Sequence, residues 1–336
     1  DVAPSRGLGD VYKRQDVLTA FKENGVDIPL SWNFGDKGKT FGYAYGTPEG
    51  FVVDDGVCVY GPSKAEYKDY LTTMHQWYEE GLLDPDMFSG GEDQTNTKLA
   101  SGKIAATMAW AGGTLQTVNT LAKEENPDFN LTAAKWPVLN KGDKPEYGFR
   151  NTKFFDGGIA IGGTCKDPVT AAKLLDYGYS KEGYMMFNFG EEGVSYTMED
   201  GKPVYTDEIL NNPEGWPISQ AIAKYAMACY NGPFVQSGEM QYFQDPEAIN
   251  AMYTWNDCNS KETTLPTVSP TEDESYEYST IINEMSTYVE EMTTKFIMGT
   301  EDIESGFDAY LKTLDQFGLE RATEIMNDAL ARYNAR

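Results

Sequence analysis

The sequence predicts an α/β fold, because short apolar strands alternate with helical segments along its 336 residues. No internal repeat interrupts this alternation, so a solenoid or propeller is not expected. Hydrophobic residues make up 40% of the chain and aromatic residues 13%, which is enough for a substantial core. The length allows one large domain or two ordinary ones.

The first half of the chain contains three expected strands and one strong helix. The strands are expected at 28–31, 103–110 and 131–138, with the end of a short helix at 97–100. A capping box from Ser63 to Glu66 is expected to open the helix, and Gly81 to end it. One face of this helix carries Tyr67, Tyr70, Leu71, Met74, Trp77 and Tyr78.

The second half begins with an expected strand at 157–163, which has glycines on both sides. Asp167 is expected to cap the next helix, with Pro168 at its first position, and Ser180 to open a second short helix before a turn at 191–196. Residues 206–280 show the least periodicity. The last part is helical again, with a stop at Gly299 and a hinge at Gly318. Its apolar stripe comprises Ile281, Ile282, Met285, Tyr288, Val289, Met292, Phe296 and Ile297.

The order of motifs in 157–196 resembles the extracellular solute-binding proteins of ABC transporters, family 1, the maltose-binding-protein-like type. The Gram-positive oligosaccharide-type lipoprotein branch is the most similar. The motifs that carry the resemblance are Asp167-Pro168, Ala171-Ala172, Leu174-Leu175-Asp176-Tyr177, Ser180-Lys181-Glu182-Gly183 and the turn at 190–196. The final helices over 306–333 also match the ending of this family.

The resemblance implies a two-lobed, type II periplasmic-binding-protein-like clamshell. Residues 16–140 would form the first part of the C-terminal lobe, and 141–205 a segment of the N-terminal lobe with the hinge crossings. Residues 206–336 would form the second part of the C-terminal lobe with the C-terminal helices. The implied function is capture of an oligosaccharide or sugar-derived solute by hinge closure and delivery to membrane permease subunits of an ABC importer, without a cofactor. A monomer that is lipid-anchored at the extracellular face of the cell membrane is expected.

Residues 5–15 read as the translation of a sequencing adapter, so we set 1–15 aside as non-native. The natural chain would then begin near Asp16 inside a longer protein. Much of the N-terminal lobe, with its principal sheet, the signal peptide and the anchor cysteine, is expected to be missing. The chain is therefore expected to bind ligand weakly or not at all and to expose an apolar patch.

Charge and cysteine content narrow the function further. The formal net charge of −26 disfavours nucleic-acid binding, because the chain would repel phosphate backbones. Cys58, Cys165, Cys229 and Cys258 show neither a CxxC pair nor metal-ligand spacing. They could form no disulfide, one or two.

Catalytic signals are sparse, so an enzyme is not expected. His75 is the only histidine and is expected to have a structural or surface role, and no P-loop, GxSxG or HExxH motif occurs. Glu191 and Glu192 are adjacent in a turn, so they would point apart instead of facing each other across a sugar. Residues 22–30 are too short for the calcium loop found in relatives, and no metal is expected. A polysaccharide-active hydrolase and a surface ligand sensor of the same fold remain alternatives.

Aromatic residues in expected loops are the candidates for ligand binding, because aromatic planes match the C–H faces of sugars and polar groups match their hydroxyls. Glu192 and Gly193 are expected to make a turn or hinge contact. Trp77 lies on the helix stripe and is expected in the core, and Trp136 could serve either role. The candidate ligand-binding residues are Trp32, Asn33, Trp110, Phe155, Asp156, Trp216, Tyr230 and Trp255.

Overall fold

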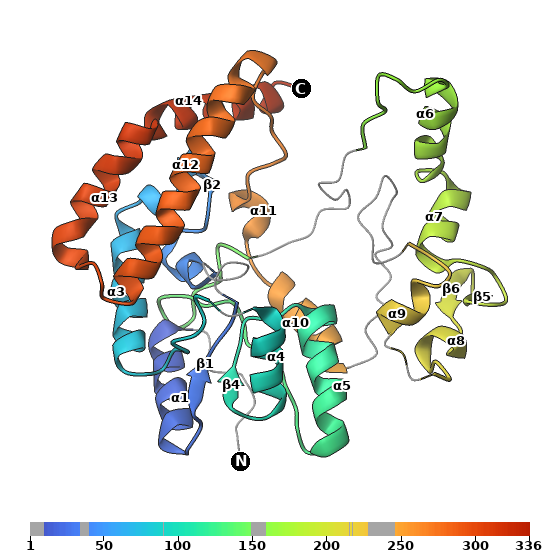
Figure 1. Cartoon of the computed structure of the whole chain (residues 1–336), viewed down its shortest axis with the longest axis horizontal. Helices are drawn as coiled ribbons and strands as arrows, with labels where there is room; N and C mark the ends of the chain where they lie inside the picture. Colours follow the sequence, from blue (N-terminus) through green and yellow to red (C-terminus); the bar gives the residue numbers. More distant parts are fainter. Residues whose placement is uncertain are drawn as a thin grey trace. The chain divides into compact units, whose positions relative to one another are not determined.

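The computed structural model describes residues 10–33, 40–89, 91–148, 159–214, 216, 218–227 and 246–336 (Figure 1). The chain divides into two compact units. Unit 1 comprises 1–110, 118–149 and 250–336, and unit 2 comprises 111–117 and 150–249.

Unit 1 combines a small parallel pair of strands with most of the helices. Its elements are α1 (Val11–Glu23), β1 (Ile28–Leu30), η1 (Thr40–Tyr45), β2 (Phe51–Asp54), β3 (Val57–Tyr60), η2 (Gly61–Ser63), α3 (Glu66–Glu79), α4 (Glu92–Ala100), β4 (Ile104–Ala106), most of α5 (Gln116–Glu125) and of α10 (Pro246–Asn256), α11 (Ser260–Thr263), α12 (Glu272–Ile297), α13 (Ile303–Phe317) and α14 (Leu319–Asn334). β1 and β4 pair in parallel, with Ile28 opposite Ile104.

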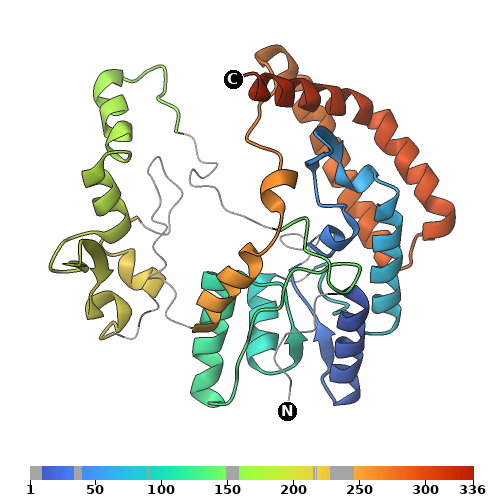
Figure 2. The ribbon, with the colours of Figure 1, turned by 180° about the vertical axis from the view of Figure 1, so that it is seen from behind.

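The core of unit 1 lies where α3 packs on α12 and α13 (Figures 1 and 2). The expected stripe on α3 is confirmed, since Tyr67, Tyr70, Leu71, Met74 and Trp77 are all buried. The Tyr67 and Thr293 hydroxyls are hydrogen-bonded at 2.6 Å, so the α3–α12 contact is polar as well as apolar. Burial of aromatic and aliphatic side chains from segments more than 200 residues apart is the main source of stability here.

Unit 2 has a smaller core, built locally. Its elements are η3 (Ala111–Leu115), α6 (Pro168–Tyr177), α7 (Lys181–Phe189), β5 (Tyr196–Glu199), β6 (Lys202–Tyr205), α8 (Asp207–Leu210) and α9 (Ile218–Ile222). The buried members of its cluster are Phe189, Tyr196, Tyr205, Ile209, Ile218, Ala221 and Ile222. α8 and α9 pack on this cluster within unit 2. The lobe boundaries expected from the sequence, with 206–336 in the C-terminal lobe, stay a prediction.

Two hairpins share the same turn chemistry. β2 pairs with β3 across Asp55-Gly56, and β5 pairs with β6 across Asp200-Gly201. In both turns the two residues have positive φ, at 47° and 83° in the first and 48° and 78° in the second. Turns of this type match the twist of antiparallel strands and favour Asp-Gly. The Asp-Gly signal was present in the sequence, but the hairpins had not been expected.

Helix ends confirm several expectations and correct one. The Asp167 carboxylate accepts from the Thr170 amide at 3.0 Å, and the Ser180 hydroxyl accepts from the Gly183 amide at 2.9 Å, so both expected caps are confirmed. The capping box from Ser63 to Glu66 is wrong. Ser63 lies in η2 and donates to the Tyr60 carbonyl, because the 3-10 turn ends before α3 begins.

Two expected strands are absent from the described residues. Residues 131–138 form no strand, and the β-bridge recorded there joins Val138 to Asp10. Asn119 takes the place of a strand partner, since its side-chain amide donates to the Leu131 carbonyl at 2.9 Å and accepts from the Leu131 amide at 2.7 Å. Residues 159–163, the described part of the strand expected at 157–163, are not in a ladder either.

The start of α1 and the junction between α13 and α14 are each defined by a single residue. α1 begins at Val11 with Asp10 as its N-cap, so part of the segment that the sequence assigned to an adapter is helical here. At the other end, Gly318 joins α13 to α14 with φ of 106°, as expected for a hinge. A Cβ atom at Gly318 would lie 3.2 Å from Ile281, so glycine is favoured by conformation and by space. No helix among the described residues has both the length and the apolar composition of a membrane span.

Candidate functional site

The parallel pair β1–β4 brings two predicted ligand-binding segments to one edge. Trp32 and Asn33 follow the carboxyl end of β1, and Trp110 lies four residues beyond β4. The Ser31 amide donates to the Ala106 carbonyl at 3.1 Å, which continues the pairing past β1. Ligands of α/β proteins usually bind beyond the carboxyl ends of parallel strands, so this edge is the candidate site in unit 1.

A buried carboxylate fixes this edge. Asp84 accepts from the Ser31 hydroxyl at 2.7 Å, from the Lys98 ammonium at 2.9 Å and from the Asp86 amide at 3.0 Å. Burial acts to raise the pKa of Asp84, but the hydrogen bonds from Lys98 and Ser31 outweigh it, so the pKa lies below its usual value. The charged carboxylate therefore ties α4 to the end of β1.

The side chains at this edge differ in exposure. Trp32 has no exposed surface, and its ring centroid lies 5.5 Å from that of Phe41. A ring buried in this way cannot stack on a sugar in this conformation, so direct contact by Trp32 is not supported. Asn33 is half-buried, and Trp110 is 37% exposed. Of the two tryptophans that follow these strands, Trp110 is therefore the one with accessible surface.

Trp255 belongs to a second aromatic cluster in unit 1, with Trp136, Tyr43 and Tyr147. The Trp136 indole N–H donates to the Trp255 carbonyl at 2.7 Å, and the Trp255 indole N–H donates to the Ala134 carbonyl at 2.9 Å. These reciprocal bonds join the end of α10 to the segment before Pro137. The pair is therefore a structural clamp, while both rings are only half-buried and keep some accessible surface.

Sequence reasoning missed the two tyrosines of this cluster. The Tyr43 ring centroid lies 5.7 Å from Trp136 and 6.3 Å from Tyr147. Burial, helped by the charge of Glu49, raises the pKa of Tyr43 to about 12, so its phenol stays protonated at neutral pH. In 42–46 tyrosine alternates with Gly or Ala, a pattern that did not reveal which residues these rings would contact.

Trp216 lies in unit 2 beside a charged neighbour. The Lys224 ammonium lies 5.5 Å from the Trp216 ring centroid and 3.6 Å from a Glu208 carboxylate oxygen. The Tyr225 hydroxyl also donates to Glu208, at 3.0 Å. The arrangement gives a half-buried indole a cation–π contact at a polar surface, a combination suited to a polar ligand.

The remaining predicted residues lie either in the turn before β5 or outside the described residues. Glu192 and Gly193 lie exposed in the turn before β5, where the Gly193 amide donates to the Tyr196 carbonyl at 2.7 Å. Gly193 has φ of 83°, which glycine tolerates. The turn is confirmed, and its hinge role stays a prediction. Phe155, Asp156 and Tyr230 lie outside the described residues.

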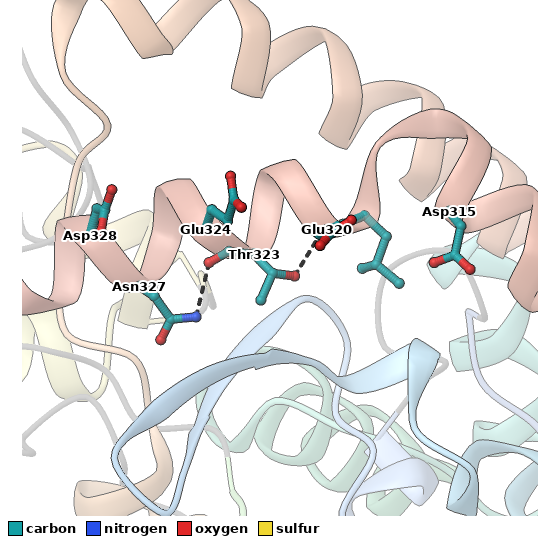
Figure 3. A pocket seen from close by; sticks show the side chains of 7 residues that line it. Asp315, Glu320, Thr323, Glu324, Asn327 and Asp328 are labelled. Atoms are coloured by element: carbon teal, nitrogen blue, oxygen red, sulfur yellow. Dashed lines mark hydrogen bonds between the residues drawn. The ribbon is translucent and has the colours of Figure 1, made fainter.

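The hollow shown in Figure 3 offers a different chemistry. It has a volume of about 620 Å³ and lies along α14, lined by Asp315, Leu319, Glu320, Thr323, Glu324, Asn327 and Asp328. Four of these seven residues are acidic and none is aromatic, so a sugar would find no stacking surface. Thr323 and Asn327 donate to carbonyls of their own helix, and Asn327 also bonds the backbone of Cys58.

Histidine and cysteine residues form no metal-binding group within the described ranges. His75 is hydrogen-bonded through Nδ1 to the Ile297 carbonyl at 3.0 Å, which confirms a structural role between α3 and the end of α12. Cys58, Cys165 and Cys258 carry free thiols, and Cys229 lies outside the described residues. No group of three or more His, Cys, Asp or Glu side chains in the described part could hold a metal ion.

The family follows from comparison with known proteins. The model for bacterial extracellular solute-binding proteins matches residues 11–185, and the chain belongs to this family. Lipoprotein LipO of Bacillus subtilis (strain 168) is 23% identical over 346 aligned positions, which cover 98% of this chain and 65% of LipO. An uncharacterized protein encoded in the butB 5' region of Niallia circulans is 26% identical over 164 residues, 47% of this chain and 61% of that protein. The chain thus spans less than two thirds of the length of these relatives.

Solved structures confirm the fold. The alginate-binding protein AlgQ2 matches with a TM-score of 0.76 and 24% identity, over 96% of this chain and 68% of AlgQ2. A solute-binding protein of Bifidobacterium longum infantis ATCC 15697, associated with an ABC transporter and binding human milk oligosaccharides (HMO), matches with a TM-score of 0.71 and 19% identity, over 97% and 70%. The chain therefore has the type II periplasmic-binding-protein-like fold predicted from its sequence.

Proposed function

We propose that this chain belongs to the substrate-binding component of an ABC importer that captures an oligosaccharide or a sugar-derived solute. The observation that carries the proposal is its membership of the extracellular solute-binding family together with its fold. Proteins with this fold are described as binding alginate, human milk oligosaccharides and, for FusA of S. pneumoniae, fructo-nystose. A polymer of hydroxyl-rich rings is the ligand chemistry that these three share.

The proposed mechanism is binding without bond chemistry. Ligand would contact both lobes and shift an open–closed equilibrium toward the closed state, from which membrane permease subunits accept it. Unit 1 would contribute to the C-terminal lobe and unit 2 to the N-terminal lobe, with the turn at Glu192 and Gly193 taking part in the hinge. The family is extracellular, and its LipO relative is a lipoprotein, which supports a lipid anchor at the cell surface. The protein would act there as a monomer.

The accessible aromatics support particular roles in binding. Trp110 would stack on a sugar ring at the β1–β4 edge, with Asn33 offering its amide to hydroxyls. Trp32 would hold this edge from the core side. Trp216 in unit 2 would provide a second stacking surface, and Trp255 would act through the clamp with Trp136. Phe155, Asp156 and Tyr230 remain proposed ligand contacts.

A thermal-shift screen tests the proposal. The whole protein, cloned from its source gene, would be heated with alginate oligosaccharides, human milk oligosaccharides and fructo-oligosaccharides, and the sugars would then be analysed by chromatography. A ligand at about 100 times its Kd raises stability by about 2.7 kcal/mol, which is a shift of several degrees. A shift with unchanged sugar supports capture for transport. Sugar cleavage would instead establish the hydrolase alternative, and no shift with any sugar would contradict the ligand class.

A further inference from the structure

Asn33, the polar ligand contact proposed in unit 1, lies two positions after a fully buried serine. Neither Ser31 nor Trp32 has any exposed surface, whereas Asn33 is half-buried. Asn33 is therefore the first side chain beyond β1 that keeps accessible surface. Two residues of chain span at most about 7 Å, so the bonds that hold Ser31 also limit where Asn33 can lie.

The backbone at the carboxyl end of β1 has a bridging partner on each side. Leu30 pairs in parallel with Ala106 of β4 and with Leu83 of the segment after α3. The Ser31 amide donates to the Ala106 carbonyl at 3.1 Å, and the Asp84 amide donates to the Leu30 carbonyl at 3.0 Å. These bonds hold the chain as far as Ser31 and bring Asp84 beside it.

The Asp84 side chain then bonds the Ser31 hydroxyl directly. Ser31 Oγ donates to Asp84 Oδ2 at 2.7 Å, and the Lys98 ammonium donates to the same oxygen at 2.9 Å. The Asp86 amide donates to Asp84 Oδ1 at 3.0 Å. A hydrogen bond to an ionised acceptor is roughly twice as strong as a neutral one. The buried carboxylate, held by donors on α4 and in its own turn, is therefore a firm anchor for Ser31.

The position of this bond in the chain relates it to ligand binding. The Trp32 ring centroid lies 5.5 Å from that of Phe41, so Trp32 is anchored in the core while Ser31 is anchored by Asp84. Two consecutive anchored residues thus precede the accessible Asn33. A side chain that is already held in place binds ligand more tightly, because less conformational entropy is lost when the complex forms.

We propose that Ser31 and Asp84 are positioning residues for the ligand, because their hydrogen bond sets where Asn33 presents its amide. This inference rests on the proposed function, in which Asn33 contacts sugar hydroxyls. Ser31 and Asp84 are both buried, so they do not meet the ligand themselves. Their effect on affinity passes through Asn33.

A double-mutant cycle on affinity tests the proposal. Ser31→Ala, Asn33→Ala and the double variant would be made in the whole protein cloned from its source gene and titrated with the alginate, human milk and fructo-oligosaccharides of the thermal-shift screen. Asn33→Ala is expected to weaken binding about fivefold through one lost hydrogen bond, and Ser31→Ala about threefold. In the Asn33→Ala background, Ser31→Ala is expected to change affinity by less than about 1.5-fold, because both residues act through one contact. Independent, multiplicative effects would overturn the proposal.

Thr293→Val is the matched control, since it removes another buried hydroxyl bond of unit 1, the one to Tyr67 in the core. Like Ser31→Ala, it is expected to lower the Tm by a few degrees, but it is expected to leave affinity unchanged. An equal loss of affinity in Thr293→Val would show that Ser31 acts through stability alone and would overturn the proposal. Ser31→Cys keeps the shape of serine but is only a weak donor, and it replaces Ser31→Ala if that variant does not fold.

Hydrogen exchange gives a second readout that needs no ligand. Amides in peptides containing 31–33 are expected to exchange at least about tenfold faster in Ser31→Ala than in the parent, and at the parent rate in Thr293→Val. Unchanged exchange at 31–33 in Ser31→Ala would overturn the proposal whichever sugar binds. A parent that binds no sugar but shows the expected acceleration would contradict the proposed ligand class alone, because the bond would still be seen to hold this segment.

Discussion

Unit 1 and unit 2 differ in where their packing partners come from. In unit 1, α3 packs on α12 and α13, so residues such as Tyr67 and Thr293 meet across 226 positions of sequence. In unit 2, the described buried members of the cluster around Phe189 all lie within 189–222, and α6 has no buried residue. The comparison shows that similar apolar helix faces can be buried or exposed, depending on whether another part of the chain packs against them.

The largest expected effect contrasts a buried aromatic of unit 1 with an exposed leucine of unit 2. Phe296→Ala removes a fully buried ring that contacts Tyr310 edge-on, and is expected to lower the free energy of unfolding by about 3–5 kcal/mol. Leu174→Ala is expected to change it by less than about 0.5 kcal/mol, because the side chain is exposed. Urea unfolding followed by circular dichroism measures both. Similar decreases in the free energy of unfolding for the two variants would contradict the difference in packing between the two units.

The next effect addresses the core of unit 2. Phe189 is buried, and its ring centroid lies 5.9 Å from that of Tyr196 and 5.4 Å from that of Tyr205. Phe189→Ala is expected to destabilise unit 2 by about 3 kcal/mol, the low end of the range, since a small cluster can relax around the cavity. Hydrogen exchange by mass spectrometry would show faster exchange in peptides from 181–210. Acceleration confined to peptides of α3 and α12 would contradict a separate core.

A third variant probes the buried carboxylate at the β1–β4 edge. Lys98→Met leaves Asp84 without its ammonium partner and is expected to cost about 2 kcal/mol. Lys295→Met is the matched control, because its partner Glu291 is exposed on the same helix and the pair contributes about 0.5 kcal/mol or less. Chemical denaturation of both variants gives the comparison. A Lys98→Met variant as stable as the control would show that the network does not fix this edge.

The fourth prediction concerns ligand affinity and tests whether the β1–β4 edge of unit 1 contributes to binding. Trp110→Ala in the whole protein is expected to weaken binding about tenfold, because one stacking surface worth roughly 1.4 kcal/mol is lost. Tyr276→Ala, which removes an aromatic ring that is 84% exposed on α12, is the control. Titration calorimetry with the best sugar of the screen would measure both. Equal affinities would exclude Trp110 from the site.

The smallest expected effect is the dependence of stability on pH. The pKa of Asp84 is lower in the folded state than in the unfolded chain, since the hydrogen bonds from Lys98 and Ser31 outweigh burial. Its stabilisation is therefore complete above the unfolded pKa of about 4 and is lost as the pH falls through the lower folded value. Subtracting the pH profile of Asp84→Asn from that of the parent isolates this contribution. A difference that stays constant between pH 5 and 2 would contradict the assignment.

Much of the helical structure could be predicted because its signals are local and periodic. The apolar stripes of α3 and α12 and the helix caps Asp167 and Ser180 were all predicted correctly. The strands were harder, since a strand exists only with a partner. The Asn119 side chain replaced the partner expected along 131–138, and 159–163 found none among the described residues.

The candidate site was less predictable than the fold. The sequence placed both Trp32 and Trp110 near strand ends. The structure shows that they differ in burial, because Trp110 is partly exposed whereas Trp32 lies in the core. The cluster of Trp136, Trp255 and Tyr43 joins residues more than 200 positions apart, which no spacing rule could reveal. Exposure and long-range contact are properties of the folded chain, and both decide which aromatics can meet a ligand.

The central claim is that the protein captures a sugar without transforming it. Isothermal titration of the whole protein with the sugar that gives the largest thermal shift tests this claim most directly, when the recovered sugar is analysed by mass spectrometry. The account predicts saturable one-site binding and recovery of an intact oligosaccharide. Heat that continues at a constant rate after each injection, with shortened sugar in the recovered solution, would contradict the account and identify an enzyme.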